Sequence, residues 1–407
     1  RIAGGKMADD EKDEQSTFPT DKTETNKEND RRDERSCRVA YVFNEELIKL
    51  SDELPKIKGR ASIVHSLIRS YGLLSKMRLI SPHKAKLTDI LLFHSSEYID
   101  CLQKLSDEDD DEKWMEEAET FGLTYDCPAY PGIFDTASYI TGASVKAAQA
   151  LSHNYADVAI NWTGGWHHAK RDEAAGFCYI NDIVVAILIL RQKFDKVLYV
   201  DLDLHHGDGV EDAFCATSKV MTVSFHKHAP GFFPGTGSSD DCGMGKGQYY
   251  TVNVPLQDGM NDENFVSLVK RVLGTVYKSF KPQAVVCQCG ADGLDGDPMA
   301  SFNLSTDALV DSVQFITNWK LPLLLLGGGG YNMANTARCW TAITASVLKE
   351  KLPSDIPEHR FFPLYGPDYE LTTSQGNRID RNKDSHLQSV IAAVDNRLLH
   401  GSKSLDL

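Results

Sequence analysis

The chain has 407 residues and a net charge of −15 at pH 7, with 42 % hydrophobic and 25 % charged residues. This composition is close to that of an average globular protein and excludes disorder throughout. The acidity argues against a protein that holds nucleic acid by neutralising phosphates, so we predict no direct nucleic-acid partner. It is compatible with a cationic substrate such as a lysine-rich protein tail, which an acidic surface attracts.

Cysteine usage and hydropathy bear on where the protein works. Nine cysteines are spread along the chain without a CxxC pair, so we expect them to be mostly reduced and the protein to be intracellular. No apolar leader opens the sequence. The longest apolar runs, 183–190 and 321–326, are far shorter than the ~20 residues of a membrane span. The sequence therefore predicts a soluble protein with no membrane partner.

Residues 1–36 stand apart from the rest of the chain. They are rich in charged residues and nearly free of apolar ones, which cannot support a packed core. We predict a disordered acidic extension, in which residues 1–6 precede Met7 and are candidates for a non-native leader. From residue 37 the pattern changes, and we predict one catalytic domain over 37–407.

Short apolar runs typical of buried strands alternate with segments of helical spacing over this domain. The expected strands are 39–43, 156–161, 197–202, 220–224, 284–288 and 321–326. The expected helices are 61–74, 182–191, 263–279 and 306–319, and an acidic loop is expected at 107–112. Continuously apolar strands that alternate with helices indicate a parallel sheet covered on both faces. We therefore predict a single open, doubly wound α/β domain.

Polar residues and glycines follow five of the predicted strands, where open parallel sheets bind ligands. In chain order these segments are Trp162-Thr-Gly-Gly-Trp-His-His168, Asp201-Leu-Asp-Leu-His-His-Gly-Asp208, His226-Lys-His228, Gly290-Ala-Asp292 and Gly327-Gly-Gly-Gly-Tyr331. Core packing would not place so many polar groups at the ends of strands, so we predict a functional site there.

Asp203 and His205 are two residues apart at a strand end and so project to the same face. With Asp292 from another strand end as third ligand, they would form a three-ligand catalytic zinc site. An Asp-x-His pair alone is weak support, because structural Asp–His hydrogen bonds are at least as common. The metal site is favoured because a further acid and a histidine pair follow neighbouring strands.

Two adjacent histidines, His167 and His168, follow two glycines, so a tight turn can direct both imidazoles into the site. Each histidine needs a hydrogen-bond partner for its second ring nitrogen, and Asp201 and Asp208 are carboxylates without another assigned role. We therefore predict two His–Asp dyads. A second metal held by the histidine pair is the alternative.

Tyr331 directly follows the glycine run 327–330. The run lacks the Lys-Ser/Thr of a phosphate-binding loop, so nucleotide binding is not expected. A tyrosine hydroxyl beside a metal-bound carbonyl can stabilise an oxyanion. Phe177 and Phe233, each beside glycine or proline, are candidate walls of a narrow apolar channel, although a core position is the default for a lone phenylalanine.

These segments resemble, nearly unbroken from residue 39 to the C-terminus, the zinc-dependent class I histone deacetylases. The most specific runs are Gly164-Gly-Trp-His-His-Ala-Lys170, Gly176-Phe-Cys-Tyr179, Tyr199-Val-Asp-Leu-Asp-Leu-His-His-Gly-Asp-Gly-Val210, Phe233-Pro-Gly-Thr-Gly237 and Gly327-Gly-Gly-Gly-Tyr-Asn332. Within the class, Tyr125-Asp-Cys-Pro128 and Asp297-Pro-Met299 are most similar to its type 8 branch. The resemblance implies an arginase/deacetylase fold around a parallel eight-stranded sheet. It also implies removal of acetyl, or longer acyl, groups from N6-acyl-lysine side chains of histones and other proteins.

The resemblance implies roles for individual residues. Asp203, His205 and Asp292 would hold one zinc ion. His168, paired with Asp208, would act as general base and acid, and His167, paired with Asp201, would give electrostatic support. Tyr331 would polarise the substrate carbonyl. The resemblance assigns substrate binding to Asp126, Trp166, Gly176, Phe177, Phe233 and Met299, and an internal acetate-release channel to Arg60.

Two potassium sites are also implied by the resemblance. The inner site comprises Asp201, Asp203, His205, Ser224 and Phe225, and the outer site comprises Phe214, Thr217, Val220 and Tyr250. The implied partners are acetylated histone tails and other acetyl-lysine proteins, with no obligate corepressor complex. The implied location is the nucleus and the cytoplasm.

Three segments depart from the family pattern: residues 43–47, which lack the tyrosines expected at the entrance, Tyr130-Pro131, and Gly293-Leu-Asp295. We therefore expect the chemistry to be retained and the substrate preference at the rim to differ. The alternatives are a polyamine or other small-molecule deacetylase, an arginase-like binuclear manganese enzyme, and an inactive acyl-lysine-binding scaffold.

Overall fold

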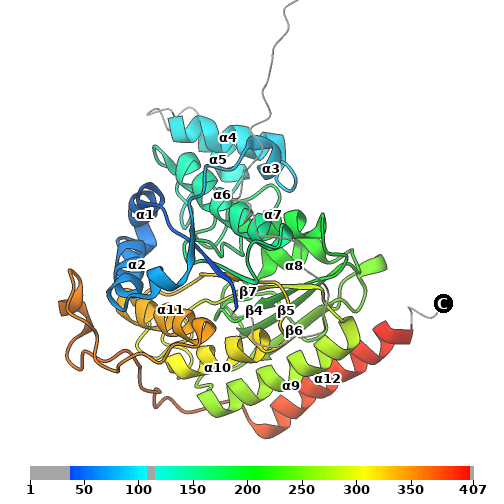
Figure 1. Ribbon diagram of the computed structural model, residues 1–407. Helices are drawn as coiled ribbons and strands as arrows, with labels where there is room; N and C mark the ends of the chain where they lie inside the picture. Colours follow the sequence, from blue (N-terminus) through cyan, green and yellow to red (C-terminus); the bar gives the residue numbers. More distant parts are fainter. Residues whose placement is uncertain (1–36, 108–114, 404–407) are drawn as a thin grey trace, which may run out of the picture. The chain divides into compact units, whose positions relative to one another are not determined.

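The computed structural model describes residues 37–107 and 115–403 (Figure 1). The predicted extension 1–36 and residues 108–112 of the predicted acidic loop lie outside these ranges. The described chain is built on one eight-stranded sheet of order β2-β1-β3-β8-β7-β4-β5-β6, in which all neighbouring strands are parallel. The prediction of an α/β fold around a parallel eight-stranded sheet is confirmed.

Six of the eight strands were expected from the sequence, and the two that were missed form the sheet edges. The strands are β1 (Val39–Val42), β2 (Arg78–Ile80), β3 (Val158–Asn161), β4 (Val197–Asp201), β5 (Val220–Lys227), β6 (Thr251–Leu256), β7 (Ala284–Gln288) and β8 (Leu323–Leu326). Edge strand β2 has only three residues, two of them exposed. In β6, Asn253 and Pro255 interrupt the apolar run, and a proline is tolerated because an edge strand leaves one row of N–H groups unpaired.

Helices cover both faces of the sheet. They are α1 (Glu45–Asp52), α2 (Arg60–Ser70), α3 (Leu87–Ile90), α4 (Ser96–Asp107), α5 (Met115–Thr120), α6 (Ile133–Ser152), α7 (Asp182–Arg191), α8 (Asp208–Phe214), α9 (Asp262–Phe280), α10 (Thr306–Thr317), α11 (Met333–Leu348) and α12 (Asp384–Lys403). Figure 1 shows α6, α7 and α8 on one side of the sheet and α9, α10 and α12 on the other. Helix α6 is buried along most of its length but carries mainly Ala, Ser and Thr, so its apolar periodicity was too weak to predict it.

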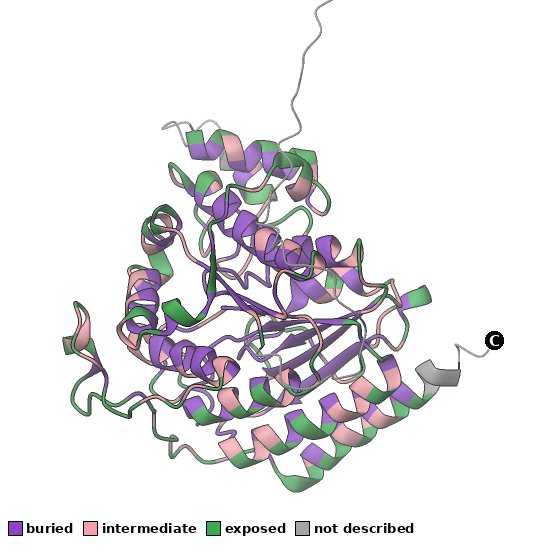
Figure 2. Ribbon diagram, in the orientation of Figure 1, coloured by how far each residue is buried: buried purple, intermediate pink, exposed green. Residues whose placement is uncertain are grey.

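The central strands are buried along their whole length, apart from the last residue of β5 (Figure 2). Because all strands run in the same direction, the segments that follow β3, β4, β5, β7 and β8 meet at one edge of the sheet. The nine cysteines, all in the described ranges, form no disulfide. Among the described helices, none combines the length and the apolar character needed to cross a membrane.

Candidate active site

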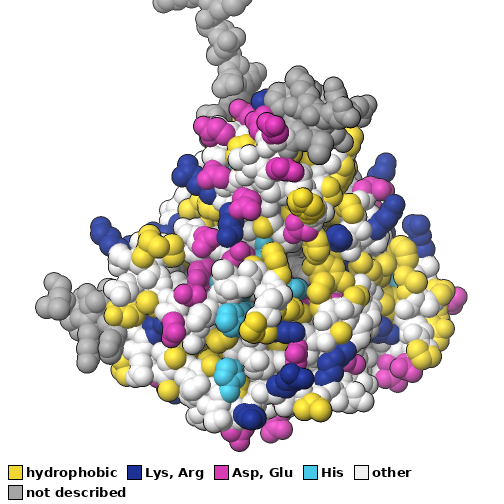
Figure 3. Space-filling view, turned by 180° about the vertical axis from the view of Figure 1, so that it is seen from behind, with side chains coloured by type: hydrophobic (Ala, Val, Ile, Leu, Met, Phe, Trp, Pro, Cys, Tyr) yellow, Lys and Arg dark blue, Asp and Glu magenta, His cyan; other side chains and the backbone are white. Residues whose placement is uncertain are grey.

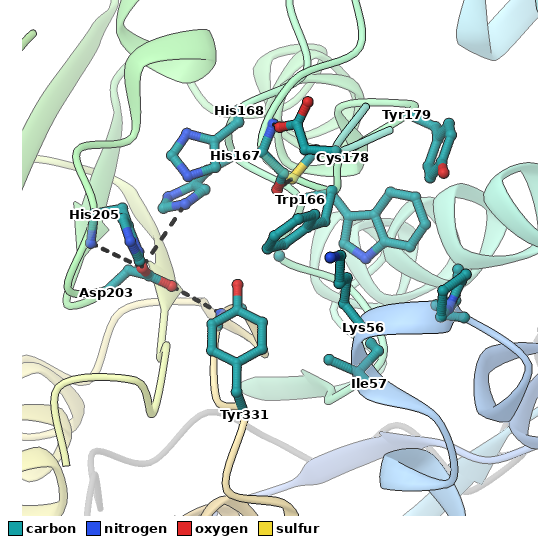
Figure 4. A pocket seen from close by; sticks show the side chains of 18 of the residues that line it. Lys56, Ile57, Trp166, His167, His168, Cys178, Tyr179, Asp203, His205 and Tyr331 are labelled. Atoms are coloured by element: carbon teal, nitrogen blue, oxygen red, sulfur yellow. Dashed lines mark hydrogen bonds and ion pairs between the residues drawn. The ribbon is translucent and has the colours of Figure 1, made fainter. Parts of the chain in front are cut away.

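A cavity of about 700 Å³, counted out to the solvent at its mouth, lies at this edge of the sheet. Its walls come from the segments that follow β3, β4 and β8, from residues 176–179 and from the 3₁₀ turn η1 (Pro55–Ile57). Figure 4 shows the histidines, Asp203 and Tyr331 grouped at one end of it. On the face in Figure 3, apolar side chains gather beside a hollow in the surface.

The turn after β3 holds His167 and His168 with their ring centroids 3.9 Å apart. The turn is anchored by Asp182, the first residue of α7. Its buried carboxylate accepts hydrogen bonds from the backbone N–H groups of Gly165 (3.1 Å) and Trp166 (2.9 Å). Both imidazoles are therefore fixed against the cavity by a carboxylate that the sequence did not single out.

Each of these histidines donates its Nδ1–H to a buried carboxylate. His167 Nδ1 lies 2.8 Å from Asp201 Oδ2, and His168 Nδ1 lies 2.7 Å from Asp208 Oδ1. The hydroxyl of Tyr199 also donates to Asp201 Oδ2, at 2.6 Å. The structure thus brings together both pairs expected from the sequence and leaves the Nε2 atom of each imidazole for the cavity.

The two pairs differ in protonation. Burial lowers the pKa of His167, but the charges of Asp201 and Asp203 outweigh this and raise it to about 9. Burial and the nearby charge of His167 lower the pKa of His168 to about 4. At neutral pH, His167 is therefore an imidazolium, and His168 is a neutral imidazole able to accept a proton.

Asp203, His205 and Asp292 form a compact group of possible metal ligands. Asp203 and His205 follow β4, Asp292 follows β7, and one ligand atom from each lies within 4.8 Å of the others. His205 Nδ1 is 2.8 Å from Asp292 Oδ2 and 3.3 Å from Asp203 Oδ1. Across residues 37–107 and 115–403, this is the one group of three or more His, Cys, Asp or Glu side chains with such spacing.

The surroundings of this group fit a divalent cation. A Cβ atom at Gly290 would collide with the carboxylate of Asp203, and one at Gly329 with that of Asp292, so two glycines make room for the ligands. Gln288 Nε2 donates to Asp203 Oδ2 at 2.8 Å, which orients that carboxylate.

The charge of the group points the same way. Burial lowers the pKa of His205, but its hydrogen bonds to the two carboxylates outweigh this and raise it to about 10. Burial and the charge of Asp203 raise the pKa of Asp292 to about 7. A bound cation would displace these protons, and two carboxylates with one imidazole are ligands that zinc accepts.

Tyr331 is placed by contacts of its backbone and of the preceding glycines. Asp297 accepts hydrogen bonds from the backbone N–H groups of Tyr331 (2.7 Å) and Asn332 (3.1 Å). Arg60 donates to the carbonyls of Gly328 and Gly330, both at 2.9 Å. Burial raises the pKa of the Tyr331 phenol well above its usual value, so it stays protonated, and Figure 4 shows its hydroxyl directed into the cavity.

The walls of the cavity contain most of the residues that the resemblance assigns to substrate and product. Asp126, Trp166, Gly176, Phe177 and Arg60 all line it. Asp126 Oδ2 accepts from the backbone N–H of Gly176 at 2.8 Å, and the Phe177 ring meets that of Tyr331 edge-on at 5.9 Å.

Phe233 and Met299 are placed differently. Phe233 packs edge-on against His168, with ring centroids 4.9 Å apart, and is 44 % exposed. Met299 is not among the lining residues and packs, partly buried, against the hydrophobic core.

Sequence reasoning missed an aromatic contact on a ligand candidate. The Phe232 ring stacks on the imidazole of His205, with centroids 5.1 Å apart and planes 5° from parallel. Lys227 Nζ lies 4.3 Å from the Phe232 ring centroid and 2.7 Å from Asp258 Oδ1. The sequence shows two adjacent phenylalanines, Phe232 and Phe233, but it does not indicate which of the two rings contacts His205.

The residues that the resemblance assigns to potassium fall into two groups. Asp201 of β4 and Ser224 of β5 are register partners, and Phe225 follows Ser224. In the outer group, Thr217 N–H donates to the carbonyl of Phe214 at 3.1 Å. Val220 begins β5, and Tyr250 directly precedes the paired strand β6.

Known proteins resemble this chain over most of its length. Residues 54–347 match the family model described as "Histone deacetylase domain". The chain is 53 % identical over 364 residues to histone deacetylase 8 of Danio rerio, and the aligned region covers 89 % of this chain and 96 % of that protein. It is 50 % identical over 366 residues to histone deacetylase 8 of Xenopus tropicalis (90 % and 99 % covered). It is 44 % identical over 336 residues to histone deacetylase 1 of Homo sapiens (83 % and 69 % covered). The predicted resemblance to class I deacetylases, and within them to the type 8 branch, is confirmed.

Proposed function

Because the chain belongs to the histone deacetylase family and is a protein lysine deacetylase, we propose that it cleaves N6-acetyl-lysine amides with one zinc ion held by Asp203, His205 and Asp292. The proposal depends above all on the buried cluster of these three side chains, whose ligand atoms lie within 4.8 Å of one another at one end of an open cavity. Acetylated histone tails and other acetyl-lysine proteins are the proposed substrates.

A zinc ion at this position would polarise the acetyl carbonyl and lower the pKa of a water molecule beside it. The neutral imidazole of His168 accepts the proton of the attacking water at Nε2, while Asp208 holds its Nδ1–H. The hydroxyl of Tyr331 donates a hydrogen bond to the carbonyl oxygen as negative charge develops there. Protonated His168 then gives its proton to the departing lysine amine.

His167 has a different role, although it has the same kind of partner. In the metal-free protein, its pKa of about 9 keeps it charged at neutral pH, which makes it a poorer proton acceptor than His168. We assign it electrostatic stabilisation of the negative charge that forms during attack, with Asp201 fixing its orientation through the 2.8 Å contact. A second metal on the two histidines is disfavoured, because the described residues hold no group of three or more ligand side chains besides Asp203, His205 and Asp292.

Substrate and product contacts follow from the walls of the cavity. The rings of Phe177 and Phe233 flank Gly176, where a Cβ atom would collide with the imidazole of His168, so the aliphatic stem of an acyl-lysine can pass close to the base. Asp126 at the rim would accept hydrogen bonds from the substrate backbone, and Trp166 lines the same cavity. Met299 is proposed from the resemblance alone, because it does not line the cavity. Arg60 lines both this cavity and an inner one beside Trp162 and Trp340, which supports a path for acetate.

Further parts of the proposal rest on the resemblance. The two potassium groups are centred on Ser224 and on Thr217, and we propose that they stabilise the segments that carry the ligands. We also propose that the protein acts in nucleus and cytoplasm, without an obligate corepressor complex and without direct contact to nucleic acid. The acidic net charge of −15 supports the last point.

A panel of acyl substrates tests the proposal. We expect an acetyl-lysine peptide to be hydrolysed, the activity to be lost on chelation and zinc to restore it. Fatty-acyl-lysine peptides report whether longer acyl groups are also accepted. Faster turnover of acetyl-polyamines than of peptides would favour the small-molecule deacetylase, and peptide binding without turnover would favour the inactive scaffold.

A further inference from the structure

One cationic side chain in the cavity wall has no part in the mechanism above. Lys56, in the 3₁₀ turn η1, lines the cavity while remaining exposed. Its ammonium nitrogen lies 5.1 Å from the centroid of the Phe177 ring. Figure 4 shows this nitrogen directed into the cavity beside Trp166.

Over the described parts of the chain, Lys56 makes no ion pair with a carboxylate. Asp126 lines the same cavity and accepts from the backbone N–H of Gly176, but its carboxylate does not lie within ion-pair distance of Lys56. A cation–π contact leaves most of the ammonium surface free for an anionic partner.

The position of Lys56 restricts what that partner can be. The metal-ligand candidates are buried, whereas Lys56 is exposed, so its charge acts on what lies at the mouth and not on the acyl group at the floor. The Phe177 ring contacts both the ammonium nitrogen of Lys56, at 5.1 Å, and the ring of Tyr331, at 5.9 Å. A peptide whose acetyl-lysine stem runs past Phe177 therefore brings its neighbouring residues near Lys56, because consecutive Cα atoms are only about 3.8 Å apart.

We propose that Lys56 is a specificity-determining residue that favours acetyl-lysine peptides carrying Asp or Glu within two residues of the acetyl-lysine. This inference rests on the proposed function, since it concerns the same cavity and the same reaction. The rest of the protein has the opposite sign, with a net charge of −15. Lys56 would thus supply a local attraction that the overall charge does not.

The expected effect is small and acts on binding. An exposed ion pair between a lysine and a carboxylate changes a binding constant by about two- to fivefold at low salt. Added salt screens this attraction. The effect belongs in KM, because the flanking carboxylate is equally far from the reacting carbonyl before and during the reaction.

The test compares four pairs of acetyl-lysine peptides, each pair differing only by Glu against Gln at one position within two residues of the acetyl-lysine. The kcat/KM ratio of Glu to Gln peptide is measured for the full unmodified chain and for Lys56→Gln, Lys56→Arg and Lys58→Gln. Lys58 is the matched control, because it lies two residues away, is exposed and does not line the cavity.

At one position or more, we expect the ratio to be about two- to fivefold higher in the unmodified chain than in Lys56→Gln. Lys56→Arg and Lys58→Gln should keep the higher ratio, and added NaCl should reduce it. Equal ratios in the unmodified chain and Lys56→Gln at all four positions, or equal loss in Lys58→Gln, would overturn the inference. If no peptide is hydrolysed by any of these chains, the proposed function fails instead.

Discussion

The floor and the rim of the cavity are built in contrasting ways. At the floor, the histidines and carboxylates that we assign to catalysis are buried and hydrogen-bonded to one another, as in the 2.7 Å contact of His168 with Asp208. At the rim, Lys56 is exposed and Phe233 is 44 % exposed. The floor is therefore pre-organised for one reaction, whereas the rim can change without disturbing it. Substitutions should accordingly abolish chemistry at the floor and only redistribute substrates at the rim.

The largest effect is expected from Asp292→Ala. The substitution removes one of two carboxylates that contact His205 and one of three ligand candidates, so metal binding and turnover should both fall to background. Metal content and peptide hydrolysis measure this directly. Asp295→Ala is the control, because that carboxylate pairs with Arg378 at the surface, 2.7 Å away, and its loss should leave both readings unchanged. Metal-replete, active Asp292→Ala protein would refute the ligand assignment.

Tyr331→Phe should lower kcat by about 10²–10³-fold, the usual cost of losing one oxyanion donor. Binding of the acetyl-lysine peptide should persist, because the ring that faces Phe177 is retained. Steady-state kinetics and calorimetric binding separate the two effects. Tyr365→Phe is the matched control, since its buried hydroxyl has no hydrogen-bond partner within residues 37–107 and 115–403 and lies outside the cavity lining. An unchanged kcat in Tyr331→Phe would show that the phenol is not the donor.

The two histidines of the floor should titrate far apart in the metal-free protein. The raised pKa of His167, about 9, keeps it charged from acid up to that pH. The lowered pKa of His168, about 4, keeps it neutral at every pH above that value. Nitrogen NMR of the imidazoles at pH 7 should show one doubly protonated ring and one neutral ring with its proton on Nδ1. Two neutral rings would remove the basis for giving them different roles.

A smaller effect is expected from Phe232→Leu, which keeps an apolar side chain but removes the ring stacked on His205. Supporting contacts of a metal ligand typically contribute 10–100-fold to affinity, and because this contact is only a stack we expect about tenfold weaker metal binding. Competition with a chelator gives the affinity. Phe232→Tyr should restore it, and equal affinities in the Leu and Tyr variants would show that stacking is irrelevant. The rim effect at Lys56 is smaller still.

The same contrast explains what the sequence could predict. Asp203 and His205 are two residues apart, and their spacing at a strand end is visible without a structure. The floor was predictable because strand ends of a parallel sheet converge on one edge. The eight-stranded sheet itself was only partly visible, since β2 and β6 are edge strands with short or interrupted apolar runs.

Contacts between distant segments could not be predicted in this way. Lys56 contacts Phe177, which lies 121 residues further along the chain, and no sequence motif connects the two residues. The anchoring role of Asp182 was hidden because aspartates are common in the first turn of helices. Which of two adjacent phenylalanines stacks on His205 depends on the path of the loop after β5, which no local pattern specifies.

The central claim is a single zinc ion held by Asp203, His205 and Asp292 and required for lysine deacetylation. The most direct measurement is the metal content of the full chain by plasma mass spectrometry, followed in parallel with hydrolysis of an acetyl-lysine peptide during chelation and zinc titration. We predict one zinc per active chain, with activity lost and regained in proportion to it. Two manganese ions per chain at full activity, or full hydrolysis by metal-free protein, would contradict the claim.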